Sequence, residues 1–400
     1  GERWGRHWLD AARYADSAGF ESDAPRSVWK YRDWVIASLN ADLPFDQFTI
    51  EQLAGDLLPE ATTEQRIATG FLLNGIQDGA SEPSRYDAVV DRLNTVGEVF
   101  LGLTLGCAQC HSHKFDPISQ EEYFRLFAFI NTADETPLEL AGAEDIARRD
   151  ALRGQLVQLE RERDEYARKL APQLPDWEAA LSPEDRARLS GPAKTAIIVP
   201  ANERNAEQQL ALLAELGKLD PGYCERRKCA ADLAEQIPHL PTTPVLRQSD
   251  PPRTTHVFHR GEFSQPTKVV SPGVPAMLIP LASEAATRMD FARWLVSREN
   301  TRTARVAVNR VWQAYFGVGM VATAGDFGSR GDSPSHPELL DWLAAEFVAQ
   351  GYSLKALHRL IVTSATYRQS SRFRSDAAEI DPANRMLTRQ NRLRFEAEII

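Results

Sequence analysis

Two cysteines and a histidine stand together in the segment Cys107-Ala-Gln-Cys110-His111. This spacing is typical of covalent c-type haem attachment, in which two thiols add to the vinyl groups of the porphyrin and the adjacent imidazole binds the iron. The pattern predicts haem c, attached at Cys107 and Cys110, with His111 as the proximal ligand. In a second interpretation the two cysteines form a redox or structural disulfide and His111 is incidental.

Two polar residues that follow the motif indicate a different kind of site. His111, His113 and Asp116 would supply two imidazoles and a carboxylate, a ligand set that suits a divalent metal ion. His113 cannot be the second axial ligand of the same haem, because two residues after His111 the chain is still on the proximal side. The alternative protein is therefore a non-haem metal-dependent hydrolase or lyase, and the sequence assigns no catalytic residue under either interpretation.

Other reactive or charged residues leave their roles open. Cys224 and Cys229 could close a small disulfide loop in an oxidising compartment or remain free thiols. Five charged residues around a glycine-rich loop could bind an anion or form structural ion pairs: Arg302, Arg305, Arg310, Asp326 and Arg330.

The composition bounds the class of protein. The chain has 400 residues, which is long enough for two or three domains. Its composition, with 43% hydrophobic residues and only 4 cysteines, excludes a disordered, collagen-like or disulfide-scaffold protein. A net charge of −10 argues against a nucleic-acid partner, which needs a basic face. No apolar run reaches the roughly 18 to 20 residues of a membrane-spanning helix. Because the chain does not begin with methionine, we expect a piece cut at both ends from a longer protein.

The elements around the motif are predicted to be helical. Apolar residues recur at steps of three and four from Val89 to Cys110, which predicts a helix with both cysteines on its buried face unless Gly106 ends it. Ser119 and Glu122 form a capping box that opens a helix over Glu121–Asn131. A first helix is predicted over Glu2–Ala15, and the segment Gly75–Ser84 is predicted to be a surface loop.

The middle of the chain is predicted to contain a charged helix followed by a proline-rich region with short strands. A charged, glycine-poor helix is predicted over Glu144–Leu170, as one arm of a coiled coil or helical hairpin or as a spacer. Thr195–Pro200 and Thr255–His259 are predicted strands. Nine of the 24 prolines fall between residues 238 and 280, a density that excludes helices there.

Helices return in the last third of the chain. Thr287 and Asp290 form a capping box, and a helix over Val306–Phe316 is closed by Gly317. Ser335-His-Pro-Glu338 is predicted to cap the next helix, Leu339–Ala349.

These elements together predict a mainly α protein with four parts. Residues 1–135 form a multi-helix lobe that carries the Cys-Ala-Gln-Cys-His motif, and residues 136–192 form a charged helical hairpin or spacer. Residues 193–264 form a proline-rich linker with short strands, and residues 265–400 form a second helical lobe.

Several segments of the chain also resemble segments of known domain families. The first lobe resembles the planctomycete secreted cytochrome-like domain in five segments: Glu2-Arg-Trp-Gly-Arg-His-Trp-Leu-Asp10, Ala12-Arg-Tyr-Ala-Asp-Ser17, Tyr31-Arg-Asp-Trp-Val35, Glu51-Gln-Leu-Ala-Gly-Asp-Leu-Leu-Pro59 and Gly106-Cys-Ala-Gln-Cys-His-Ser-His-Lys-Phe-Asp-Pro-Ile118. The last lobe resembles the planctomycete secreted domain in four: Thr303-Ala-Arg-Val-Ala-Val-Asn-Arg-Val-Trp312, Gly325-Asp-Phe-Gly328, His336-Pro-Glu-Leu-Leu-Asp-Trp-Leu343 and Ser364-Ala-Thr-Tyr-Arg-Gln-Ser370. Both are domains of unknown function.

The resemblance implies a periplasmic or secreted protein in which Cys107, Cys110 and His111 hold the haem. We therefore expect an electron-transfer or haem-dependent oxidoreductase role, linked to the breakdown of complex carbohydrate. The implied partners are a redox protein such as a c-type cytochrome and a polysaccharide substrate. A secreted scaffold or polysaccharide-binding module is the remaining alternative. The sequence identifies neither the substrate nor a sixth iron ligand.

Overall fold

The computed structural model describes residues 1–17, 23–76, 81–281 and 286–394. The chain is mainly helical, as predicted, and it divides into two compact units. Unit 1 consists of residues 1–138 and 243–400, and unit 2 consists of residues 139–242. Unit 2 thus combines the predicted spacer with the first part of the predicted linker, and the remaining linker residues belong to unit 1.

Unit 1 contains both segments that resemble known domains. Its N-terminal part has these elements: α1 (Glu2–Ala11), α2 (Trp29–Ala41), α3 (Phe45–Ala54), η1 (Gly55–Leu57), α4 (Thr63–Ala68), η2 (Thr69–Leu73), α5 (Glu82–Val96), the π turn η3 (Gly97–Leu101), η4 (Leu105–Gln109), α6 (Gln120–Asn131) and β1 (Ala133–Glu139). Its C-terminal part has these: β2 (Thr242–Gln248), β3 (Thr255–Phe258), η6 (His259–Gly261), β4 (Pro266–Val270), α13 (Arg288–Leu295), α14 (Thr301–Phe316), α15 (Pro337–Ala349), α16 (Leu354–Thr363), α17 (Ala365–Arg368) and α18 (Ser375–Ile380).

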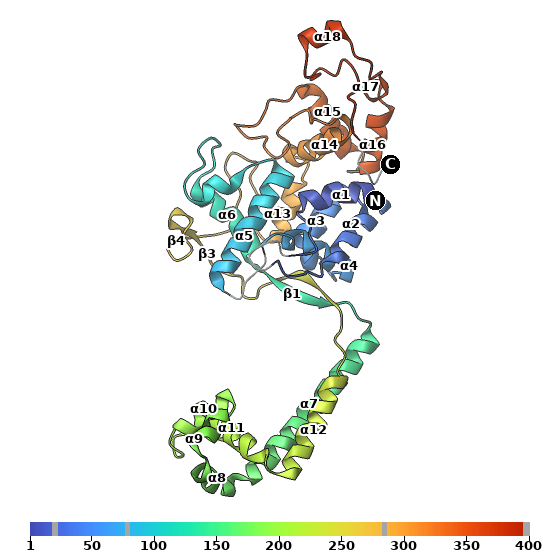
Figure 1. The fold of residues 1–400 in the computed structure, drawn as a ribbon. Helices are drawn as coiled ribbons and strands as arrows, with labels where there is room; N and C mark the ends of the chain where they lie inside the picture. The colour runs from blue at the N-terminus through green and yellow to red at the C-terminus, as the bar shows by residue number, and fades with distance from the viewer. Residues whose placement is uncertain (18–22, 77–80, 282–285, 395–400) are drawn as a thin grey trace. The chain divides into compact units, whose positions relative to one another are not determined.

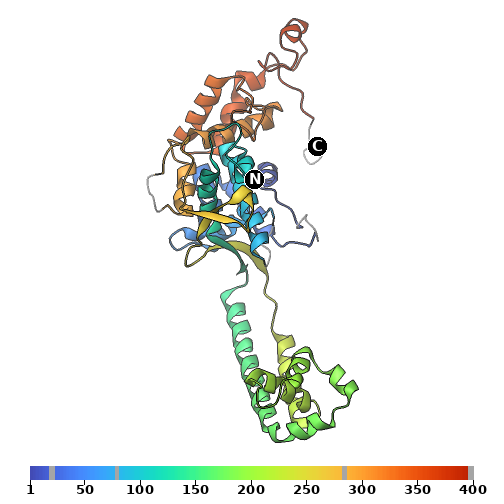
Figure 2. The same cartoon turned by 90° about the vertical axis from the view of Figure 1, so that its left-hand side faces the viewer.

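The two parts of unit 1 share one core. Helix α13 packs against both α3 and α6, and the rings of Phe129 and Phe291 stack at 4.8 Å between α6 and α13. Helix α14 packs on α15 and on the π turn η3 (Figure 1). The strands are short and form two pairs, β1 with β2 and β3 with β4, of which the second is antiparallel. Helices therefore provide the scaffold, and the strands lie at its edge (Figure 2).

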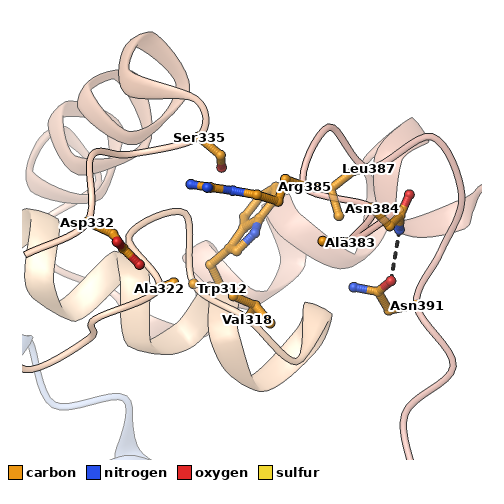
Figure 3. Close-up of a pocket in the computed structure, with 11 residues that line it drawn as sticks. Trp312, Val318, Ala322, Asp332, Ser335, Ala383, Asn384, Arg385, Leu387 and Asn391 are labelled. Atoms are coloured by element: carbon orange, nitrogen blue, oxygen red, sulfur yellow. Dashed lines mark hydrogen bonds between the residues drawn. The ribbon is translucent and has the colours of Figure 1, made fainter. Parts of the chain in front are cut away.

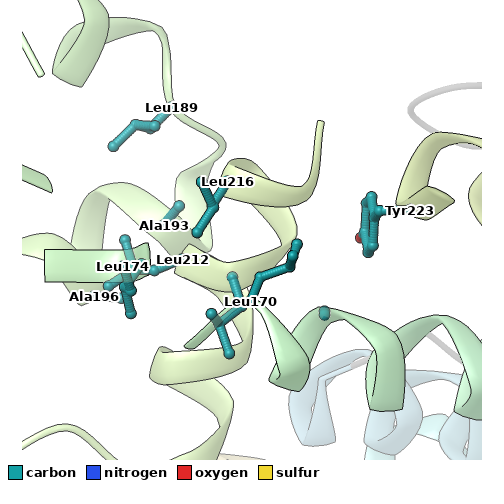
Figure 4. Close-up of a cluster of buried hydrophobic side chains, with 10 residues drawn as sticks. Leu170, Leu174, Leu189, Ala193, Ala196, Leu212, Leu216 and Tyr223 are labelled. Carbon is teal, nitrogen blue, oxygen red and sulfur yellow. The ribbon is translucent and has the colours of Figure 1, made fainter. Parts of the chain in front are cut away.

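Unit 2 is a helical hairpin that carries a cluster of shorter helices. Helix α7 (Ala143–Lys169) packs along α12 (Pro221–Gln236), so the predicted charged helix is one arm of a hairpin. The shorter helices are η5 (Ala171–Gln173), α8 (Leu174–Ala180), α9 (Pro183–Arg188), α10 (Gly191–Ile198) and α11 (Ala206–Gly217). Leucines and alanines form the buried cluster of this unit, together with Tyr223 of α12, and Figure 4 shows eight of its residues: Leu170, Leu174, Leu189, Ala193, Ala196, Leu212, Leu216 and Tyr223.

Local capping signals predicted helix starts well. The capping boxes at Ser119–Glu122 and Thr287–Asp290 are both present and open α6 and α13. Gly317 adopts φ 83° and ends α14, as predicted. The exception is the start of α15, where His336 is the N-cap residue without a side-chain bond, and Ser335 Oγ instead lies 2.9 Å from His336 Nδ1. Pro337 in the first turn is sufficient to start this helix.

Two other local predictions were wrong, one was confirmed and one lies partly outside the described residues. The predicted strand Thr195–Pro200 is helical up to Ile198, because Pro192 starts α10 and Ala193 and Ala196 bury one helical face. The first helix ends at Ala11 and not at Ala15, since Arg13 adopts φ 59°. The strand at Thr255 is confirmed as β3. The predicted loop Gly75–Ser84 includes residues 77–80, which lie outside the described residues, and α5 already begins at Glu82.

The helix predicted from Val89 to Cys110 breaks before it reaches the cysteines. Helix α5 ends at Val96, the π turn follows, and Gly102 adopts φ 57°. A side chain at Gly102 would come within 3 Å of Phe327 and Val306, so both conformation and space require glycine. The residues after Gly102 therefore start a new periodicity, and both cysteines are exposed instead of buried.

Among the described residues, no helix is both long and apolar enough to span a membrane.

Candidate functional site

A short 3₁₀ turn presents the two cysteines of the motif. Leu105 and Ala108 of η4 are buried and anchor the turn to the core of unit 1. Cys107 and Cys110 are both exposed and unpaired, and the Cys110 sulfur lies beside Gly261. The arrangement leaves both sulfur atoms accessible to a reagent or cofactor.

His111 follows the turn and is exposed, and one of its ring nitrogens is already engaged. Nδ1 lies 2.7 Å from the carbonyl oxygen of Ser112. A carbonyl can only accept, so in the neutral ring Nδ1 carries the proton and Nε2 has the free lone pair. This arrangement is typical of metal-binding histidines, in which a backbone carbonyl fixes the tautomer and the other nitrogen binds the metal.

The inner side of the turn is held by a network of hydrogen bonds. Tyr86 donates its hydroxyl to the carbonyl of Gly261 at 2.9 Å and accepts a bond from Gln109 Nε2 at 3.2 Å. Gln120 Nε2 donates to the carbonyls of Gln109 and Phe258. Burial raises the pKa of Tyr86 to about 12, with a smaller raising effect from nearby Cys110. The motif therefore sits on a rigid base.

Aromatic residues fill the space on this inner side. The ring of Tyr86 packs on Phe258, Phe263 and Phe127 at centroid distances of 5.1 to 5.8 Å. A flat macrocycle attached to Cys107 and Cys110 would therefore lie against the exposed side of the turn. Cys107, Cys110 and His111 are all exposed residues, and the His111 tautomer leaves Nε2 free, so these three residues could hold the group only on that outer side.

His113 and Asp116 hold the loop that follows the motif. The His113 side chain is 3% exposed, and its Nδ1 accepts a hydrogen bond from the backbone N–H of Asp116 at 2.9 Å. Asp116 is 5% exposed and accepts from the backbone N–H of Ser329 at 2.7 Å. His111 is exposed and apart from this pair. In the described part of the chain, no three His, Cys, Asp or Glu residues are arranged to hold a metal ion.

Two loops from distant parts of the sequence meet beside the motif. The backbone N–H of Phe327 donates to the carbonyl of Gly102 at 2.7 Å. A side chain at Gly328 would collide with the Asp116 carboxylate. The guanidinium of Arg330 lies 4.9 Å from the ring centroid of Phe115, which is 43% exposed. The Gly325-Asp-Phe-Gly328 segment therefore supports the loop that contains His113 and Asp116.

The charged residues of the glycine-rich region have structural partners. Arg305 pairs with Asp341 at 2.7 Å, and Arg310 donates to the carbonyl of Glu98 at 3.2 Å. Burial lowers the pKa of Arg302 and of Arg310, and the nearby carboxylates of Asp116 and Glu98 partly offset this. The structure thus favours a structural role over an anion pocket for Arg305, which has an ion pair, and for Arg310, which has a backbone partner.

We expect Asp116→Ala to destabilise unit 1 by about 2 kcal/mol, because it removes a buried carboxylate that accepts the hydrogen bond of the partly buried Ser329 N–H. Asp332→Ala, which removes an exposed carboxylate from the neighbouring loop, should change the stability by less than about 0.5 kcal/mol. Urea denaturation followed by tryptophan fluorescence measures both. Equal effects of the two variants would contradict the structural role of Asp116.

Cys224 and Cys229 both lie on α12 of unit 2 and are not bridged. The thiol of Cys224 donates to the carbonyl of Lys218 at 3.3 Å. The structure therefore favours the free-thiol interpretation of this pair.

Comparison with known families supports the resemblance seen in the sequence. Residues 1–135 match the family PSCyt2, described as a protein of unknown function (DUF1549), and residues 287–400 match PSD1, described as a protein of unknown function (DUF1553). No curated protein matches the chain, and no solved structure matches it.

Proposed function

For a chain that carries a PSCyt2 domain followed by a PSD1 domain, we propose that Cys107, Cys110 and His111 bind one c-type haem and that the protein transfers electrons outside the cytoplasm. The observation that supports this most is the state of the three residues together. Both thiols are exposed and unpaired, and His111 turns Nδ1 to a carbonyl and keeps Nε2 for a metal.

Each of the three residues has a defined part in this proposal. Cys107 and Cys110 would hold the haem covalently, each through a thioether bond to one of its vinyl groups. His111 would bind the iron through Nε2, while the Ser112 carbonyl holds its ring through Nδ1. Bound haem would supply one-electron redox chemistry.

The surroundings of the motif support electron exchange at the surface. Gln109, Tyr86 and Gly261 fix the turn from the inner side, so attachment would need little rearrangement of the chain. An exposed attachment edge suits contact with a redox partner such as a c-type cytochrome. We extend the proposal to a haem-dependent oxidoreductase role in the breakdown of polysaccharide, in the periplasm or as a secreted protein.

The proposal is tested by producing the protein in the periplasm of a host that has c-type haem maturation machinery. We expect a Soret band and a haem-stained band that survives denaturing electrophoresis. The double variant Cys107→Ser, Cys110→Ser should lose the stained band completely, because no thioether can form. The matched control is Cys224→Ser, Cys229→Ser, which removes the other two thiols and should retain the band.

Other outcomes identify the alternatives. Wild-type protein without covalent haem overturns the proposal. If the same protein contains a stoichiometric divalent metal ion that is lost in His113→Ala, the non-haem site of His111, His113 and Asp116 replaces it. If neither haem nor metal is found and His111→Ala changes nothing, a scaffold or polysaccharide-binding role with a structural cysteine pair remains.

A further inference from the structure

A pocket in the C-terminal part of unit 1 lies between the Asp332 loop and the segment 381–391. Its volume is about 220 Å³, which is below the roughly 300 Å³ of the smallest pockets for drug-sized ligands. Figure 3 shows the side chains of Arg385 and Trp312 in its middle, Asp332 and Ser335 on one side, and Asn384 and Asn391 on the other. A pocket of this size suits one small molecule or one residue of a polymer.

Trp312 provides a hydrogen-bond donor that the protein does not use. Its side chain is 5% exposed, and its ring stacks on Phe316 at 4.1 Å, which fixes its orientation. Within the described residues, the indole N–H has no acceptor. This nitrogen is not among the buried unpaired atoms, so it is reached by solvent in the pocket, and a ligand there could accept its hydrogen bond.

Two charged groups of the pocket are also without partners. In the described part of the chain, the Arg385 guanidinium and the Asp332 carboxylate form no hydrogen bond or ion pair with each other or with another residue. Arg385 and the Trp312 N–H together can bind a carboxylate, for which the guanidinium fork is well matched. Asp332 can accept hydrogen bonds from hydroxyl or ammonium groups of the same ligand.

The walls of the pocket are fixed before any ligand binds. Asn309 exchanges two hydrogen bonds with the backbone of Val321, each 2.9 Å long. Asn391 Nδ2 donates to the carbonyl of Phe316 at 2.8 Å, and Asn384 Nδ2 donates to Asn391 Oδ1 at 2.8 Å. Asn384 is itself buried, with φ 52°, so it organises the segment that presents Arg385. A fixed pocket lowers the entropic cost of binding.

We propose that this pocket binds a hydroxylated carboxylate of the size of a single uronic acid residue. The carboxylate would contact Arg385 and the Trp312 N–H, and the hydroxyls would contact Asp332 and the Asn391 amide, which retains one N–H and one lone pair. Val318, Ala322 and Leu387 provide an apolar wall for the C–H groups of the ring. A zwitterionic amino acid would use both charges and leave the amide unused. The inference deepens the polysaccharide part of the proposed function and does not depend on haem attachment.

Calorimetric titration of the full chain with sodium D-glucuronate, D-glucose and L-leucine tests this proposal. We expect glucuronate to bind at millimolar concentrations and glucose, which has no carboxylate, to bind at least about tenfold more weakly. Arg385→Met should weaken glucuronate binding by about tenfold, and Trp312→Phe, which keeps a ring but removes the N–H, by about fivefold. Arg372→Met removes an exposed arginine earlier in the C-terminal segment and should change nothing.

The remaining outcomes contradict the proposal. Equal binding of glucose and glucuronate, or unchanged affinity in Arg385→Met, would exclude carboxylate recognition. Tighter binding of leucine would identify a zwitterion as the ligand, and no binding of glucuronate would exclude the pocket as a sugar-acid site. Because Arg385 is exposed, its variant should fold normally, which circular dichroism checks. Repeating the titration with Cys107→Ser, Cys110→Ser separates this site from haem: we expect unchanged affinity even if the haem proposal fails.

Discussion

Replacing Arg288 with methionine should lower the free energy of unfolding of unit 1 by about 3–5 kcal/mol, because it leaves the Asp56 carboxylate buried without its cation. The two side chains are 1% and 7% exposed. Arg288 binds both oxygens of Asp56, at 2.9 and 2.7 Å, and also donates to the carbonyl of Leu53 at 2.8 Å. A methionine would fill the space of the aliphatic part of the Arg288 side chain but would supply no hydrogen-bond donor to Asp56 or Leu53.

This ion pair joins the two family regions. Asp56 lies within the PSCyt2 match and Arg288 within the PSD1 match. Its loss should therefore loosen the packing between them. Seven of the eight tryptophans belong to unit 1, so tryptophan fluorescence in a urea titration reports mainly on this unit.

Two further variants separate the buried pair from ordinary surface charge. Arg305→Met breaks the exposed pair with Asp341 and should cost less than about 1 kcal/mol. The double variant Arg288→Met, Asp56→Leu removes both charges and should recover a large part of the loss, because no buried charge is left unpaired. If Arg288→Met is no more destabilising than Arg305→Met, the buried pair does not hold the two regions together.

Local features of the fold could be predicted from the sequence, and distant contacts could not. A capping box such as Thr287–Asp290 is complete within four residues, so its presence in α13 was predictable. The partner of Arg288 is 232 residues away, and no sequence periodicity connects the two. The same holds for the pocket of Trp312, Asp332 and Arg385, which three separate segments bring together.

At the candidate site, too, local features could be predicted from the sequence and distant contacts could not. The residue types and spacing of Cys107, Cys110 and His111 were sufficient to propose their chemistry. Their exposure was predicted wrongly, because the apolar pattern continues past Gly102 while the helix does not. Gly102, where the helix breaks, is in contact with Phe327, which belongs to the other family region. The sequence around the motif alone contains no sign of that contact.

His358 should make the stability of unit 1 fall as the pH is lowered from about 7 to 4. Its ring stacks on Trp4 at 4.0 Å and meets the edge of Tyr315 at 5.8 Å. Within the described residues, its Nδ1 has no hydrogen-bond partner. Burial lowers the pKa of His358 from 6.5 to about 4, while the charge of Asp42 raises it and that of Arg3 lowers it. The ring is therefore neutral in the folded protein at neutral pH.

The direction of the effect follows from proton binding. Between pH 6.5 and 4 the unfolded chain binds a proton at His358 that the folded chain does not bind, so acid favours unfolding. The stability contribution is complete above pH 6.5 and is lost as the pH falls to about 4. A shift of this size corresponds to about 3 kcal/mol over that interval.

His358→Phe keeps an aromatic ring on Trp4 and cannot be protonated. Its unfolding free energy should therefore fall by about 3 kcal/mol less than that of the wild-type protein between pH 7 and pH 4. His259→Gln, which removes an exposed histidine of unit 1, should follow the wild-type curve. Urea titrations across the pH range give all three curves, and titration of the carboxylates cancels when they are subtracted. Parallel curves for wild type and His358→Phe would mean that the folded protein accommodates the charged ring, which its burial between α1, α14 and α16 argues against.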